Sequence, residues 1–170
     1  ALIWEPNDPK ERFKRYTYRE LHKEVCRMAN VMKRNGIKKG DRVCLYMPMI
    51  PELMFATLAS ARIGAVHSVV FAGFSAQALA DRINDSSCKM VVTTDGSYRG
   101  AKEIPIKRIV DEALEDCESV ETVVVVERTN WGLTLEEGRD VFYHEEIKHV
   151  ADDCPAEPMD AEDMLFILYT

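Results

Sequence analysis

Apolar and polar positions along the chain alternate between a helical and an extended repeat. Residues 17–20 read Thr-Tyr-Arg-Glu, which is typical of a helix-capping box, and apolar residues then recur at helical spacing until Gly36. We therefore expect a helix that begins after Thr17 and ends before Gly36. The pattern predicts three further helices, at residues 51–63, after Ser75 to about residue 84, and after Pro105 to about residue 117.

Short apolar runs lie between these helices and predict strands at residues 41–46, 66–71, 89–94, 122–126 and 164–170. Residues 66–71 are almost continuously apolar, which is the pattern of a strand buried on both faces by helices. Between residues 127 and 158 the periodicity weakens, and only a short helix around residues 144–150 is expected. Because helical and extended segments alternate, we predict an α/β fold with a mostly parallel sheet flanked by helices.

Composition and charge exclude several functional classes. Of the 170 residues, 46% are hydrophobic and 30% are charged, which is typical of a globular domain. The net charge is −7, from 22 basic and 29 acidic residues, and it argues against a nucleic-acid or membrane partner. The five scattered cysteines contain no C-x-x-C pair, which favours reduced thiols in a cytoplasmic protein over a disulfide framework or a zinc site.

The histidines are weak candidates for chemistry. His144 and His149 are five positions apart, which does not match a two-histidine metal helix and favours solvated side chains. His67 lies in an apolar run and is more typical of a buried histidine bonded to a backbone carbonyl than of a catalytic base. No complete phosphate loop or nucleophile elbow occurs, so we assign no catalytic residue and no metal ligand.

The loop after the strand at 89–94 is the strongest candidate site. Arg99 and Lys102 are three positions apart and are separated by Gly100 and Ala101, small residues that allow close approach of a phosphate-bearing ligand. Ligands of open parallel sheets bind beyond the carboxyl ends of the strands, where this loop and residues 72–75 are both expected. From the residues alone, an exposed turn with two ordinary surface cations is the commoner explanation.

Several sequence blocks resemble the N-terminal part of the adenylate-forming enzymes. The blocks at residues 40–43 and 62–66 occur throughout that superfamily. Residues 67–75, and the pair Arg99 and Lys102 before Ile104, are similar to the AMP-forming acetyl-coenzyme A synthetases. The resemblance extends over essentially the whole chain, and it favours a functional loop over an ordinary turn.

The resemblance implies an activity, and it implies that this chain is one portion of a longer parent protein. Such ligases use ATP and Mg²⁺ to convert a short carboxylic acid such as acetate into an acyl-adenylate, and then transfer the acyl group to coenzyme A. In the family, the phosphate loop follows a strand similar to residues 163–170. The resemblance therefore implies that residues 1–170 are the N-terminal portion of the large AMP-binding domain, truncated just before that loop. The ATP and Mg²⁺ sites would lie in the remainder of the parent chain. That remainder would be the partner of this fragment, and the fragment would be inactive alone.

The resemblance also implies a site for the nucleotide end of coenzyme A. An Arg-x-x-Arg/Lys element of the family matches residues 99–102, and positions around the adenine match four other residues. The implied site consists of Phe71, Ala72, Gly73, Arg99, Gly100, Ala101, Lys102 and Ile104. Ala72 stands where many relatives have glycine, and Lys102 supplies a point charge rather than a bidentate fork.

Two alternatives stay open. The parent could prefer propionate or another short acid, because the acyl pocket would lie outside the chain. The chain could also be a free-standing α/β module that binds a nucleotide or a protein partner.

Overall fold

The computed structural model describes residues 1–130 and 133–169. Within these residues six strands form a central sheet: β3 (Arg42–Met47), β4 (Val66–Phe71), β5 (Met90–Thr94), β8 (Thr122–Val126), β9 (Asp140–Phe142) and β10 (Phe166–Ile167). Their order is β10-β4-β3-β5-β8-β9, and every neighbouring pair is parallel. The predicted fold class, an α/β fold with a mostly parallel sheet, is confirmed.

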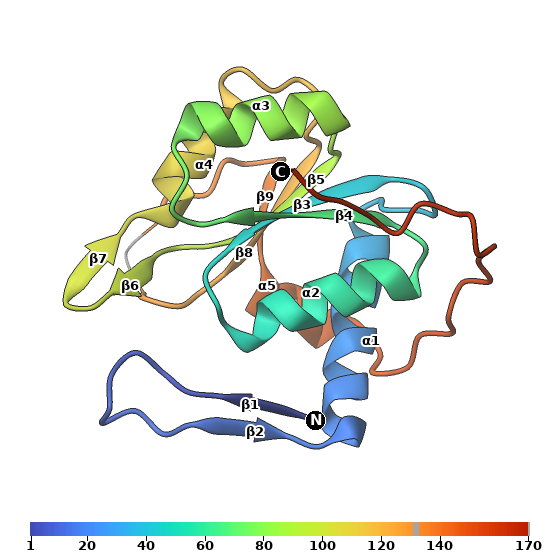
Figure 1. The fold of residues 1–170 in the computed structure, drawn as a ribbon, viewed down its shortest axis with the longest axis horizontal. Coiled ribbons are helices and arrows are strands. Elements are labelled where there is room, and N and C mark those ends of the chain that lie inside the picture. Colours follow the sequence, from blue (N-terminus) through green and yellow to red (C-terminus); the bar gives the residue numbers. More distant parts are fainter. Residues whose placement is uncertain (131–132, 170) are drawn as a thin grey trace.

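Helices cover both faces of this sheet (Figure 1). On one face lie α1 (Tyr18–Arg34) and α2 (Pro51–Arg62), and on the other lie α3 (Ala76–Ser86) and α4 (Ile106–Leu114). Alternate residues of β3 pack against the two helix layers: Val43 and Leu45 pack on the side of α1 and α2, whereas Tyr46 packs on the side of α3 and α4. The central strands are therefore buried on both sides, as parallel strands usually are.

Local signals define α1 as the sequence predicts. The Thr17 hydroxyl accepts a hydrogen bond from the Glu20 N–H at 3.3 Å, and the Glu20 carboxylate accepts one from the Thr17 N–H at 2.8 Å. Beyond the other end, Gly36 has a φ of +90°, a left-handed conformation that glycine adopts without strain. The predicted capping box and helix end are confirmed.

The β4 edge of the sheet differs from the prediction. β4 is not buried on both faces, because Val69 is 41% exposed and Phe71 is 66% exposed. β3 pairs with the full length of β4 on one side, but on the other side β10 pairs only with His67 and Ser68, so no described strand lies there beside the carboxyl half of β4. The strand expected at residues 164–170 is correspondingly reduced to Phe166–Ile167, and Thr170 lies outside the described residues.

Three further elements are absent from the sequence prediction. An antiparallel hairpin of β1 (Leu2–Trp4) and β2 (Lys14–Tyr16) precedes α1. β9 pairs with β8 where the apolar pattern had weakened. The third is the hairpin of the candidate site, described below. The short helix expected near residues 144–150 is confirmed as α5 (Tyr143–Glu146) and the 3₁₀ turn η1 (Ile147–His149).

Candidate functional site

The candidate loop is an antiparallel hairpin at the carboxyl end of β5. Its strands are β6 (Ser97–Arg99) and β7 (Lys102–Ile104), and Arg99 lies directly opposite Lys102. Gly100, with a φ of +61°, and Ala101 form the turn between them. Because directly opposite residues of a hairpin share a face, the two cations lie on the same face. Both are exposed, and neither side chain makes a hydrogen bond or an ion pair within the described part of the chain.

Asp95 fixes the start of this hairpin. Its carboxylate, in a residue that is 1% exposed, accepts hydrogen bonds from the N–H groups of Gly96 and Arg128, both at 2.7 Å, and of Thr129 at 3.0 Å. Gly96 lies so close to Thr129 that a Cβ there would be 2.6 Å from the threonine hydroxyl. The bend from β5 into β6 is therefore held by a buried carboxylate and tight packing.

The second group of expected site residues follows β4. Phe71 is exposed, and its ring lies so close to Gly73 that a Cβ at residue 73 would collide with it. Ala72 and Ile104 belong to the same hydrophobic cluster, on the α3 and α4 side of the sheet. The Tyr46 hydroxyl donates a hydrogen bond to the Phe74 carbonyl at 2.7 Å and so fixes the loop. Burial, with a smaller contribution from Cys44, raises the pKa of Tyr46 to about 12, which keeps this hydroxyl protonated.

The expected site residues therefore form two groups at the carboxyl ends of the strands. Both follow the carboxyl ends of parallel strands, as Figure 1 shows on the side where β6 and β7 project. Ile104 links the groups, since it ends β7 and packs in the cluster that contains Ala72. No hydrogen bond, ion pair or ring contact joins residues 71–73 to residues 99–102 among the residues that the structure describes.

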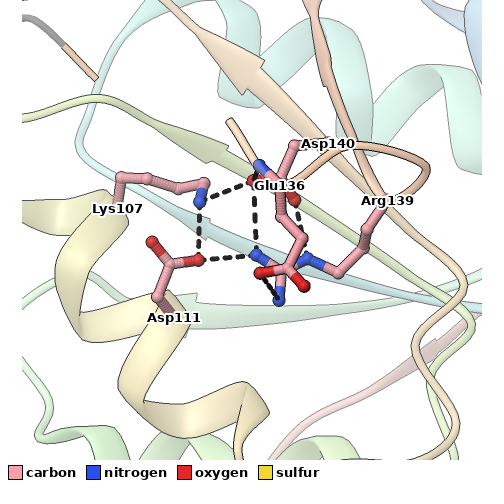
Figure 2. A network of polar contacts seen from close by, with 5 residues as sticks. All are labelled: Lys107, Asp111, Glu136, Arg139 and Asp140. Atoms are coloured by element: carbon pink, nitrogen blue, oxygen red, sulfur yellow. Dashed lines mark hydrogen bonds and ion pairs between the residues drawn. The ribbon is translucent and has the colours of Figure 1, made fainter. Parts of the chain in front are cut away.

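A partly buried ionic network includes two residues of α4, the helix that follows the hairpin (Figure 2). Lys107 Nζ is 2.6 Å from Asp111 Oδ1 and 2.8 Å from Asp140 Oδ2. Arg139 closes the network, because its Nε is 2.7 Å from Asp140 Oδ1 and its Nη2 is 2.7 Å from Asp111 Oδ1. The network ties α4, which directly follows β7, to β9, the edge strand beside β8.

Asp140 is the centre of this network. Burial alone would raise its pKa, but hydrogen bonds from Arg139, the Glu136 N–H and Lys107 hold the pKa of Asp140 below its usual value. The Lys107 N–H also donates to the Asp95 carbonyl at 3.2 Å, which connects the network to the base of the hairpin. Since each of these charges has a partner, we interpret the network as an anchor.

The histidines do not form a site. His67 is 8% exposed, burial lowers its pKa, and its ring centroid lies 5.8 Å from that of Phe166. The predicted bond to a backbone carbonyl is not found at His67 Nδ1, which has no hydrogen-bond partner within the described residues. His144 Nδ1 lies 2.6 Å from a Glu127 oxygen at the surface, and His149 is exposed. Within residues 1–130 and 133–169, no group of three side chains is arranged to bind a metal ion.

None of the helices in the described ranges is long and apolar enough to cross a membrane.

Comparison with known proteins settles the family. The AMP-binding enzyme family matches residues 1–170, the entire chain. The chain belongs to the AMP-binding enzymes. Among similar family members, "Acetyl-coenzyme A synthetase 2" of Pseudomonas putida is 60% identical over 170 residues, and that of Pseudomonas aeruginosa is 59% identical. The "Acetyl-coenzyme A synthetase" of Alkalilimnicola ehrlichii is 54% identical.

The chain spans 26% of the length of each of these AMP-binding enzymes. The resemblance stated from the sequence blocks is thus confirmed, and the parallel α/β sheet agrees with it. Sequence reasoning missed the residues that hold the hairpin in place, including Asp95. Its position directly after a buried strand was the available signal, but an acidic residue in a polar loop is too common for that signal to be specific.

Proposed function

We propose that this chain is the N-terminal portion of an AMP-forming acetate–CoA ligase. That enzyme would make acetyl-CoA from acetate, ATP and coenzyme A through an acetyl-adenylate. The observation that carries the proposal is the identity of 54–60% to acetyl-coenzyme A synthetases along the entire chain. Since the chain spans 26% of those proteins, we expect it to be inactive alone and to need the remainder of the parent.

The hairpin is proposed to bind the phosphates at the nucleotide end of coenzyme A. Arg99 and Lys102 are exposed cations on the same hairpin face, and within the described residues neither is paired with a carboxylate. Arg99 can hold two phosphate oxygens with its planar guanidinium, and Lys102 adds a point charge. Gly100 and Ala101 at the turn leave the backbone open to the ligand.

The loop after β4 is proposed to receive the adenine. Phe71 offers an exposed aromatic ring, and Gly73 has no side chain to occupy the space beside it. Ala72 and Ile104 supply apolar contacts at the base of this region. The methyl group of Ala72 would set how closely the base can pack.

ATP and Mg²⁺ are proposed as the other requirements of the parent enzyme. Their sites are proposed to lie in the part of the relatives' length that this chain does not span, beginning with a phosphate loop after the segment 163–170. A cytoplasmic location is likewise proposed, and it is supported by five free cysteines, all of them buried. The net charge of −7 supports small-molecule partners rather than nucleic acid or a membrane.

The test is made in the full-length protein. Charge-assisted hydrogen bonds contribute roughly 1.5–3 kcal/mol each, so Arg99→Ala and Lys102→Ala should each raise the KM for coenzyme A about tenfold or more. Acetate-dependent exchange of pyrophosphate into ATP, which reports adenylate formation alone, should be unchanged. Arg108→Ala is the matched control, because Arg108 is an exposed cation on the neighbouring helix α4. An unchanged KM in both hairpin variants would overturn the coenzyme A site.

Two further measurements decide between the open alternatives. Comparing kcat/KM for acetate and propionate assigns the acyl substrate of the parent. The parent reading frame tests the enzyme assignment itself, because a glycine- and serine/threonine-rich phosphate loop encoded directly after Thr170 supports it. A stop codon there would favour a free-standing binding module instead.

A further inference from the structure

We infer that Arg128 is a positioning residue that clamps the β6–β7 hairpin to the sheet and thereby orients Arg99 and Lys102, an inference that rests on the proposed coenzyme A site. The guanidinium of Arg128 lies over two aromatic rings. Its Cζ is 4.9 Å from the ring centroid of Trp4 and 5.7 Å from that of Tyr98. Tyr98 belongs to β6, so this stack joins the hairpin to the N-terminal segment.

The inner half of the clamp is fixed to the body of the protein. Trp4 is 9% exposed, and its indole N–H donates a hydrogen bond to the Met49 carbonyl, just after β3, at 2.8 Å. The Arg128 N–H donates to the buried carboxylate of Asp95 at 2.7 Å, and 17% of the Arg128 side chain is exposed. These bonds fix the Trp4 ring and the backbone of Arg128 at the carboxyl ends of the strands, so the guanidinium starts from a fixed position.

The geometry of the hairpin explains how this contact acts on the cations. Tyr98 lies opposite Glu103, and Arg99 lies opposite Lys102. Successive residues of a strand point to opposite faces, so Tyr98 occupies one face and the two cations occupy the other. Because Arg128 holds the Tyr98 face of the hairpin in position, the opposite face, which carries Arg99 and Lys102, is held in position as well. Arg128 acts on the site through the hairpin and needs no contact with a ligand.

The hairpin needs such support. An isolated two-stranded hairpin is at best marginally stable in water. At its tip the Asn7 side-chain amide donates a hydrogen bond to the Gly100 carbonyl at 3.0 Å, which adds a second tie to the loop between β1 and β2. Between these ties lies an open hollow of about 380 Å³, lined by residues that include Tyr98, Gly100 and Arg128. The hollow shows that continuous packing does not hold the hairpin against this loop. The Arg128 stack, together with the 3.5 Å pair of Arg128 Nη1 and Glu11 Oε1, and the Asn7 bond connect the hairpin to the N-terminal segment.

The stack requires an arginine in particular. A guanidinium is planar and can lie over both rings at once, whereas a lysine ammonium is a compact charge that can lie over one ring but cannot stack on two. Arg128→Lys therefore keeps the charge but weakens the clamp. On the hairpin side, Tyr98→Phe keeps the ring and Tyr98→Leu removes it.

The experiment uses these variants in the full-length protein. Arg128→Lys and Tyr98→Leu should each raise the KM for coenzyme A by roughly three- to tenfold, whereas Tyr98→Phe should leave the KM at the wild-type value. Acetate-dependent pyrophosphate exchange should be unchanged in all three. Hydrogen exchange at the backbone amides of residues 97–104 should be faster in the first two variants, which is the direct sign of a released hairpin. Arg15→Lys is the control, because Arg15 lies over the Phe13 ring at 5.9 Å in the N-terminal segment.

The outcomes separate this inference from the proposed function. If Arg99→Ala raises the KM for coenzyme A but Arg128→Lys and Tyr98→Leu change neither the KM nor the amide exchange, the clamp is wrong and the proposed site stands. If the amide exchange becomes faster while Arg99→Ala leaves the KM unchanged, the proposed coenzyme A site is wrong, and the inferred control of ligand binding fails with it.

Discussion

Lys107 Nζ lies 2.8 Å from Asp140 Oδ2, with 1% and 0% of the two side chains exposed. Removing one member of such a pair leaves the other charge buried with fewer partners. Lys107→Met should therefore lower the free energy of unfolding by about 3 kcal/mol, measured by urea unfolding of the full-length protein. Lys148→Met is the control, because the Lys148–Glu145 pair is largely exposed and its loss should have no measurable effect. A stability equal to that of the wild type in Lys107→Met would show that the network does not anchor α4.

The lowered pKa of Asp140 predicts how the stability of the protein depends on pH. Its pKa is lower in the folded protein than in the unfolded chain, so the ionised carboxylate stabilises the fold above the usual aspartate pKa of about 3.9. That contribution is lost as the pH falls through the lower, folded pKa. Asp140→Asn should therefore be less stable than the wild type near neutral pH, and the difference should shrink as the pH is lowered below about 4. Urea unfolding across this range measures the difference, and a gap that stays constant would contradict the assignment.

Two glycines near the candidate site should respond differently to a methyl group. In Gly96→Ala the new Cβ would lie 2.6 Å from the Thr129 hydroxyl and 3.2 Å from the Ile104 carbonyl, so the base of the hairpin must shift. In Gly73→Ala the three heavy atoms nearest the Cβ would all belong to the Phe71 ring, which is exposed and can turn away. Faster amide exchange at residues 97–104 is expected for Gly96→Ala and not for Gly73→Ala. Equal exchange in the two variants would rule out tight packing at Gly96.

Much of the fold is predictable because its signals are local. The capping bonds of Thr17 and Glu20, and the left-handed Gly36, lie within a few residues of the helix ends that they define. The hairpin of β6 and β7 has no such signal, because its strands are short and polar. It is held instead by Asp95 and Arg128, through contacts that depend on the tertiary structure. An apolar run such as β4 likewise does not show whether a neighbouring segment covers it.

The candidate site is predictable in part for the same reason. The spacing of Arg99 and Lys102, with the family resemblance, identifies the two cations and their common loop. The residues inferred to orient this loop are Trp4 and Arg128, which are far apart in the sequence and show no shared pattern. Lys107 appears as an ordinary polar position of an amphipathic helix, yet its side chain is buried, because its partner Asp140 comes from a strand that the periodicity does not reveal.

The pairing of the central strands has a consequence for how the protein is made. β3 pairs with β4 and β5, and β5 pairs with β8, so all of these contacts form within residues 42–126. Domains fold from the N-terminal side as the chain emerges from the ribosome, and these four strands can align while later residues are still being added. β10 then joins β4 from much further along the chain. A pause in translation after this stretch would leave a nascent sheet of four paired strands that lacks its two edge strands, β9 and β10.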